Sequence, residues 1–131
     1  PEVNLLNEKN NGENILKLIK NNLILSSHDV SSGGLIVALS EMAMPSNYGV
    51  KIRKPEKLTN LFKYFFGEDQ GRYILEIDPN NLSKVEKMLQ ENNIYYENIG
   101  YTQKEYFEIE GELKIKVKEL YEINNQWYNK Y

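Results

Sequence analysis

The sequence contains no cysteine and only one histidine, His28. Without cysteine there is no disulfide framework and no thiolate metal site, which is typical of proteins in the reducing cytoplasm. A single histidine also disfavours a zinc site built from protein side chains alone, so we expect no metal site in this chain. The first residue is Pro1 rather than Met, from which we expect a piece of a longer protein or a processed end.

The sequence also lacks long apolar runs and clustered positive charge. No run is long enough to span a bilayer and no secretory leader is recognisable, so we expect no membrane partner. The 16 Lys and Arg residues are scattered and the formal net charge is −3, which predicts no nucleic-acid partner. With 40% hydrophobic and 27% charged residues, the composition is ordinary for a globular protein. We therefore expect one domain over residues 1–131.

Hydrophobic periodicity predicts alternating helices and strands. Helical stripes are found in five stretches, at residues 11–23, 35–44, 58–66, 80–89 and 120–127. Strand patterns occur at residues 50–52, 72–78, 94–101, 106–110 and 113–117. The last two strands flank Gly111 and are expected to form a hairpin. This order predicts an α/β or α+β sandwich in which helices cover a mixed sheet.

The stretch "SSHDVSSGGLIVALSEMA" (residues 26–43) predicts a polar loop followed by a helix. Backbone N–H groups at a helix start have no partner within the helix, and the helix dipole adds positive charge there. Gly33 and Gly34 lack a Cβ, so a ligand could approach the backbone closely. Ser31 and Ser32 could cap the helix or offer hydroxyl groups. The combination suits a phosphate or carboxylate ligand.

His28 and Asp29 precede this helix start and could add a hydrogen bond or a proton, or for Asp29 a metal contact. The ordinary alternative is a capped helix with a tight glycine turn, and a half-buried histidine bonded to a backbone carbonyl. On chemistry alone this alternative is favoured, because the sequence shows no nucleophile elbow and no second catalytic group.

A second candidate is the stretch "FFGEDQGRYILEI" (residues 65–77), where Glu68, Asp69, Gln70 and Arg72 precede the clearest strand. Arg72 could bind a phosphate or carboxylate through two parallel hydrogen bonds. The alternative is an exposed polar turn with a surface ion pair, which composition alone favours. The sequence has no Walker A motif, no GxGxxG and no acidic cluster suited to Mg-ATP, so nucleotide machinery is expected outside it.

Together, "HDVSSGGLIVALSEMA" and "FGEDQGRYILEID" resemble the C-terminal domain of the aminoimidazole ribonucleotide (AIR) synthetase superfamily. Within it the likeness is to the synthetase subunits (subunit II) of the phosphoribosylformylglycinamidine synthase family, and it covers nearly the whole chain. The resemblance implies a three-layer α/β/α sandwich with a mixed sheet and partly ferredoxin-like topology. It also implies a fragment of a longer chain that is inactive alone.

The resemblance implies an ATP-dependent C–N ligase of purine biosynthesis. Formylglycinamide ribonucleotide, ammonia and ATP would give formylglycinamidine ribonucleotide, ADP and phosphate. ATP and Mg²⁺ would be held mainly by nucleotide-binding domains of the same chain, and ammonia would come from a glutaminase subunit, with a small accessory subunit. The fragment itself would supply no catalytic residue. Its substrate-binding residues would be His28, Asp29, Ser31, Ser32, Gly33, Gly34 and Arg72.

One position departs from the family pattern. The family usually has Asp where this chain has Ser32, which keeps the ability to cap but loses the charge. This disfavours a cation at the helix start and leaves anion binding open.

Two alternatives remain. The chain could be a non-catalytic scaffold or docking domain, or the equivalent domain of another superfamily member such as aminoimidazole ribonucleotide synthetase. In each case we expect an apolar patch on the isolated piece, through which it could form a homodimer.

The helix-start hypothesis predicts that ADP, ATP or formylglycinamide ribonucleotide shifts the amide resonances of residues 31–35. An absence of shifts, with His28 and Asp29 bonded to backbone, would indicate a cap or a site completed only by the missing nucleotide domain.

Overall fold

The computed structural model describes residues 3–55, 60–126 and 128. Within these residues the chain forms five helices and six strands. In chain order they are α1 (Leu5–Lys20), β1 (Ser26–Asp29), α2 (Gly34–Ala43), β2 (Tyr48–Ile52), α3 (Leu61–Phe66), β3 (Tyr73–Glu76), α4 (Leu82–Glu91), β4 (Gly100–Lys104), β5 (Tyr106–Ile109), β6 (Leu113–Lys116) and α5 (Val117–Asn125).

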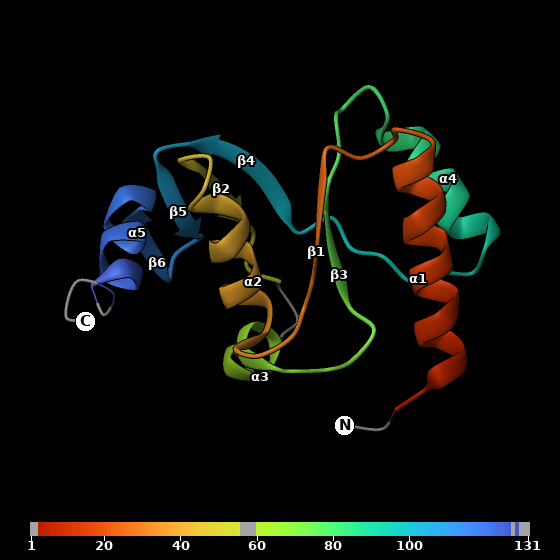
Figure 1. The fold of residues 1–131 in the computed structure, drawn as a ribbon, viewed down its shortest axis with the longest axis horizontal. Coiled ribbons are helices and arrows are strands. Elements are labelled where there is room, and N and C mark those ends of the chain that lie inside the picture. The colour runs from red at the N-terminus through yellow and green to blue at the C-terminus, as the bar shows by residue number, and fades with distance from the viewer. Residues whose placement is uncertain (1–2, 56–59, 127, 129–131) are drawn as a thin grey trace.

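The strands divide into two sheets (Figure 1). The larger has the order β4-β2-β5-β6, and it is mixed because β2 and β5 run parallel while the other pairs are antiparallel. The smaller is an antiparallel ribbon of β1 and β3, with His28 opposite Ile74. The predicted mixed sheet is therefore confirmed. Strand β3, which follows α3, lies outside that sheet and forms a separate ribbon with β1.

Two hydrophobic cores meet at this ribbon. Alternate residues of a strand point to opposite faces. Ile74 belongs to the core that α2, α3 and the larger sheet enclose, together with Phe107 and Ile109. Leu75, on the other face of β3, packs on the core between α1 and α4, where Leu18 and Val85 are fully buried. The ribbon thus lies between helix layers, as Figure 1 shows, and the predicted α/β/α arrangement is confirmed.

The apolar patterns located most elements correctly. Helix α2 ends at Ala43, just before Pro45, and α3 ends at Phe66, just before Gly67. The predicted hairpin is confirmed, since β5 and β6 pair across a turn at Gly111, whose φ of 74° favours glycine.

No helix in the described ranges is long and apolar enough to cross a membrane.

Three expectations were wrong. Helix α1 begins six residues before the predicted start, because Asn4 caps it by accepting the N–H of Asn7. The loop expected at residues 26–29 is strand β1, whose polar side chains conceal its pairing with β3. Residues 94–99 are not a strand, since β4 begins only at Gly100, where pairing with β2 begins. The predicted helical contributions of Leu58 and Trp127 lie outside the described residues.

The packing of the larger core predicts that two phenylalanines, Phe107 and Phe62, contribute very differently to the free energy of unfolding. Phe107 is 1% exposed, so Phe107→Ala should lower the free energy of unfolding by about 3–5 kcal/mol. Phe62 is 77% exposed, so Phe62→Ala should change it by less than about 0.5 kcal/mol. Urea unfolding of the two variants measures the difference, and equal losses would contradict this assignment of the core.

Candidate ligand-binding cleft

Pairing of β1 with β3 brings the two sequence motifs together. Directly after β1, the N–H of Val30 donates to the carbonyl of Arg72, at 2.9 Å. Helix α1 closes the third side, since the Asn11 side chain donates to the carbonyl of Gly71 at 3.0 Å. A cleft of about 350 Å³ opens between these segments. It is lined by Glu8, Asp29, Val30, Ser31, Ser32, Glu68, Gln70, Gly71, Arg72 and Tyr73.

Four of the seven predicted site residues line this cleft, namely Asp29, Ser31, Ser32 and Arg72. Loop residues Glu68 and Gln70 join them, so the two candidate motifs form one site. The other three predicted residues have different surroundings.

Gly33 and Gly34 shape the turn that starts α2. Their φ values of 82° and 70° are left-handed, a region where glycine is favoured. A Cβ at Gly34 would lie 2.7 Å from the carbonyl carbon of Phe66, so α2 packs directly on the end of α3. Gly33 is the N-cap, and neither Ser31 nor Ser32 caps the helix through its side chain. Both serines are exposed instead.

A carboxylate from the second motif occupies the start of α2. The N–H of Gly33 donates to Oε1 of Glu68 at 2.7 Å. Negative charge at this position is favoured by the helix dipole. The sequence pattern did not single out this contact, because the two residues are 35 positions apart and Glu68 looks like an ordinary loop residue. An external anion at Gly33 would therefore have to displace Glu68.

Arg72 is held within its own loop. Its Nη1 atom donates to the carbonyl of Gly67 at 3.3 Å and lies 3.4 Å from Oδ2 of Asp69. The Asp69 side chain is half exposed, so this pair contributes on the order of 0–1 kcal/mol to stability. Its effect is to orient the guanidinium group at the edge of the cleft.

Tyr64 on α3 lies close to the same loop. Burial, followed by the neighbouring Glu97 carboxylate, raises the pKa of Tyr64 to about 12, and the charge of Arg72 opposes the shift. The hydroxyl donates to Glu97 at 3.2 Å. Tyr64 therefore stays protonated at neutral pH and bonds to the loop before β4.

The cleft has an acidic balance of charge. Glu8, Asp29 and Glu68 line it against a single guanidinium group, that of Arg72. Across the described part of the chain, no group of three or more His, Asp or Glu residues could hold a metal ion. The residues that line the cleft do not fit Mg-ATP. Their three carboxylates would repel a triphosphate, and the described residues include no cluster of three or more His, Asp or Glu that could hold the Mg²⁺.

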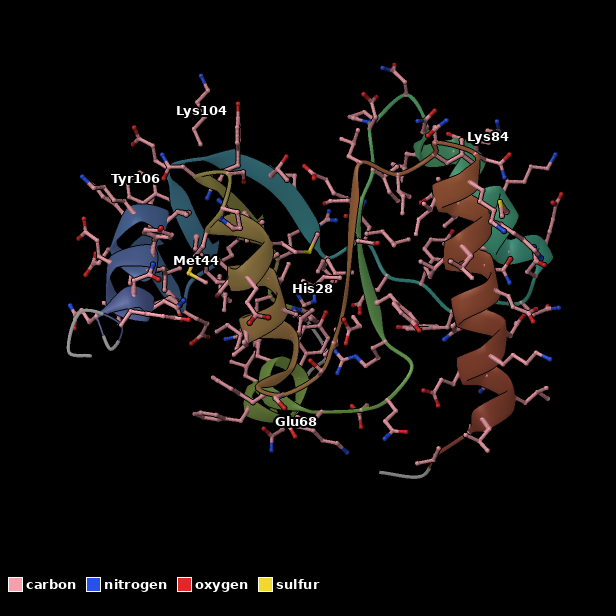
Figure 2. All side chains as sticks on the ribbon, viewed as in Figure 1. His28, Met44, Glu68, Lys84, Lys104 and Tyr106 are labelled. Carbon is pink, nitrogen blue, oxygen red and sulfur yellow. The ribbon has the colours of Figure 1, made fainter. Side chains whose placement is uncertain are left out.

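His28 lies apart from the cleft lining. Its Nδ1 is 2.6 Å from the carbonyl oxygen of Asp29, which can only accept, so the proton of this contact is on Nδ1. Its Nε2 is 3.5 Å from Oε2 of Glu41 on α2. His28 (labelled in Figure 2) thus lies between β1 and the helix that follows it, and the geometry matches a half-buried histidine bonded to a backbone carbonyl.

The fold and the sequence place the chain in a known family. Residues 1–111 match the family described as AIR synthase related protein, C-terminal domain. The chain belongs to this family.

Relatives within the family carry a more specific name. The chain is 44% identical over all 131 residues to the Phosphoribosylformylglycinamidine synthase subunit PurL of Pelagibacter ubique, and 34% identical over 134 aligned positions to that of Bartonella bacilliformis. It spans 18% of the length of each of these proteins. The predicted similarity to this synthetase subunit is confirmed.

Solved structures share the fold. A Thermotoga maritima PurL complexed with FGAR matches 87% of this chain and 21% of its own, with a TM-score of 0.74 at 18% identity. The same protein complexed with ATP matches 86% of this chain and 21% of its own, with a TM-score of 0.75 at 15% identity. These identities establish the fold alone.

The packing of α2 on α3 predicts that Gly34→Ala is more destabilising than Gly111→Ala. Both residues have positive φ, so both substitutions incur a backbone cost of about 1 kcal/mol. Only Gly34 has backbone atoms within reach of a new Cβ, whereas Gly111 has nothing within 4 Å. The difference in unfolding free energy should exceed about 1 kcal/mol. Equal losses would show that α3 can move away from α2 without cost.

Proposed function

We propose that this chain is the C-terminal domain of a longer, cytoplasmic synthetase that makes formylglycinamidine ribonucleotide. The observation that carries the proposal is the 44% identity, over every residue of the chain, to a synthase subunit whose name states this activity. The reaction consumes formylglycinamide ribonucleotide, ammonia and ATP. Phosphorylation activates the amide oxygen of the substrate, and ammonia then displaces the phosphate to give the amidine.

In this proposal the cleft binds part of the ribonucleotide substrate. Such a molecule offers hydroxyl and amide donors together with a single phosphate. Carboxylates such as Asp29 accept from the donors, the hydroxyl groups of Ser31 and Ser32 add weaker bonds, and Arg72 is the one cation suited to the phosphate. The three carboxylates favour this ligand over a triphosphate. ATP, with its Mg²⁺, is then held by the nucleotide-binding domains of the same polypeptide.

Gly33, Gly34 and His28 act indirectly in this proposal. The glycines hold the turn that presents the two serines, and His28 lies between β1 and α2, with its Nε2 3.5 Å from Oε2 of Glu41. None of the described residues performs the chemistry, so the isolated chain is inactive. Ammonia comes from a glutaminase subunit, which acts together with a small accessory subunit.

A second candidate is a docking domain that does not bind substrate. Two observations favour it: Glu68 already occupies the start of α2, and Arg72 is bonded within its own loop. Both candidates place the chain in the same synthetase, and they differ in what the cleft residues do.

Ammonia-dependent synthesis by the full-length polypeptide separates them. If the cleft binds substrate, Arg72→Ala should lower kcat/KM for formylglycinamide ribonucleotide by about 10–100-fold, the value of a charged hydrogen bond. Asp29→Asn should lower it by a smaller factor, because the neutral amide still accepts. Lys118→Ala, an exposed change on α5, is the matched control and should leave the rate unchanged.

The outcomes are distinct. Unchanged kinetics for both cleft variants would favour the docking domain. A folded, full-length wild-type protein that forms no formylglycinamidine ribonucleotide from formylglycinamide ribonucleotide, ammonia and ATP would overturn the proposed function.

A further inference from the structure

The turn that leads into strand β3 is held against helix α1. Gly71 has a left-handed φ of 71°, and a Cβ built on it would lie 3.4 Å from Cα of Glu8, so the turn packs on the backbone of the helix. The side chain of Asn11 donates to the carbonyl of Gly71 at 3.0 Å. The hydroxyl of Tyr73 lies 3.6 Å from the position that a Cβ would take on Gly12. Figure 1 shows the segment between α3 and β3 running toward α1 before the strand begins.

Arg72 lies within this turn, and the carbonyl on each side of it is fixed by a hydrogen bond. The carbonyl of Gly71 accepts from Asn11 on α1, and the carbonyl of Arg72 itself accepts from the N–H of Val30 at 2.9 Å. The guanidinium group is held less firmly, since its contacts within its own loop are 3.3 and 3.4 Å long. Its place in the cleft therefore depends mainly on the two main-chain carbonyls.

Of these two hydrogen bonds, one needs a particular side chain. Val30 donates through its backbone N–H, which every residue except proline provides. Asn11 donates through its side-chain amide, and without that bond the glycine at position 71 leaves the turn wide conformational freedom. The residues that line the cleft do not include Asn11, so an effect of Asn11 on a ligand there passes through the turn.

We propose that Asn11 is a positioning residue, which holds Arg72 in place for the phosphate of the ribonucleotide substrate. The inference rests on the proposed function, and in particular on Arg72 as the group that binds this phosphate. Removing the Asn11 amide leaves the Gly71 carbonyl to water and allows the turn to carry the guanidinium group away from the cleft. Substrate then binds more weakly, whereas ATP, held by other domains in the same proposal, does not.

A double-mutant cycle in the full-length polypeptide tests the inference, with ammonia-dependent synthesis as the assay. Asn11→Ala should raise KM for formylglycinamide ribonucleotide by about 3–10-fold, the value of one side chain–backbone hydrogen bond. The kcat and the KM for ATP should stay unchanged. Because Asn11 acts through Arg72, adding Asn11→Ala to Arg72→Ala should cause no further loss of kcat/KM.

The neighbouring Asn10 provides the matched control. Its side chain also donates from α1 to a main-chain carbonyl, that of Asn92 at the end of α4, at 3.3 Å. Asn10→Ala and Asn11→Ala therefore each remove one amide donor from the same helix, and urea unfolding should show losses of stability of similar size. Only Asn11→Ala should raise KM for the ribonucleotide.

Several results would overturn the inference. An unchanged KM in Asn11→Ala, or an equal rise in Asn10→Ala, would leave Asn11 with a purely structural role. A loss that is as large in the Arg72→Ala background as in the wild type would show that Asn11 acts independently of Arg72.

Failure of the proposed function gives a different pattern. Wild-type kinetics for Asn11→Ala beside an impaired Arg72→Ala would refute the positioning role and leave the function of the cleft standing. Wild-type kinetics for Arg72→Ala would refute the substrate role of the cleft together with the positioning role. A full-length wild-type protein that makes no product would overturn the proposed function itself.

Discussion

The backbone pairing of β1 with β3 is the constraint on which the rest of the structure depends. It aligns residues 26–29 with residues 73–76, and the paired residues lie between 44 (Asp29 and Tyr73) and 50 (Ser26 and Glu76) positions apart in the sequence. The same ribbon separates the two hydrophobic cores, because Ile74 and Leu75 face opposite ways. The hydrogen bond from Val30 to Arg72 extends the pairing into the cleft. The two motifs can form one site only because this ribbon exists.

The charges at the start of α2 and along the cleft lining determine the electrostatic character of the cleft. A helix start attracts negative charge, and here Glu68 supplies it from within the chain. Among the charged residues that line the cleft, Arg72 is the single cation against three carboxylates, so the lining carries more negative than positive charge. Ser32 in the same lining is neutral, whereas a carboxylate at that position would add to the negative charge already gathered there.

Hydrophobic periodicity located the helices and strands whose side chains are buried. It failed for a strand that is held mainly by backbone hydrogen bonds. The stripes of Leu35, Leu39 and Phe65 located α2 and α3, and the alternation around Phe107 located β5. Strand β1 could not be found in this way, because "SSHD" has no apolar alternation. For the site, local motifs indicated the correct segments. The contact of Glu68 with Gly33 and the placement of His28 facing Glu41 needed the tertiary fold.

The dependence of the cleft on main-chain bonds has a consequence for how such a domain can evolve. Amide and carbonyl groups are the same in every residue except proline, so a cleft positioned by the β1–β3 ribbon tolerates wide exchange of side chains around it. The Thermotoga maritima structures keep the fold at 15–18% identity. Sequences that differ at most of their side chains can therefore keep the same scaffold.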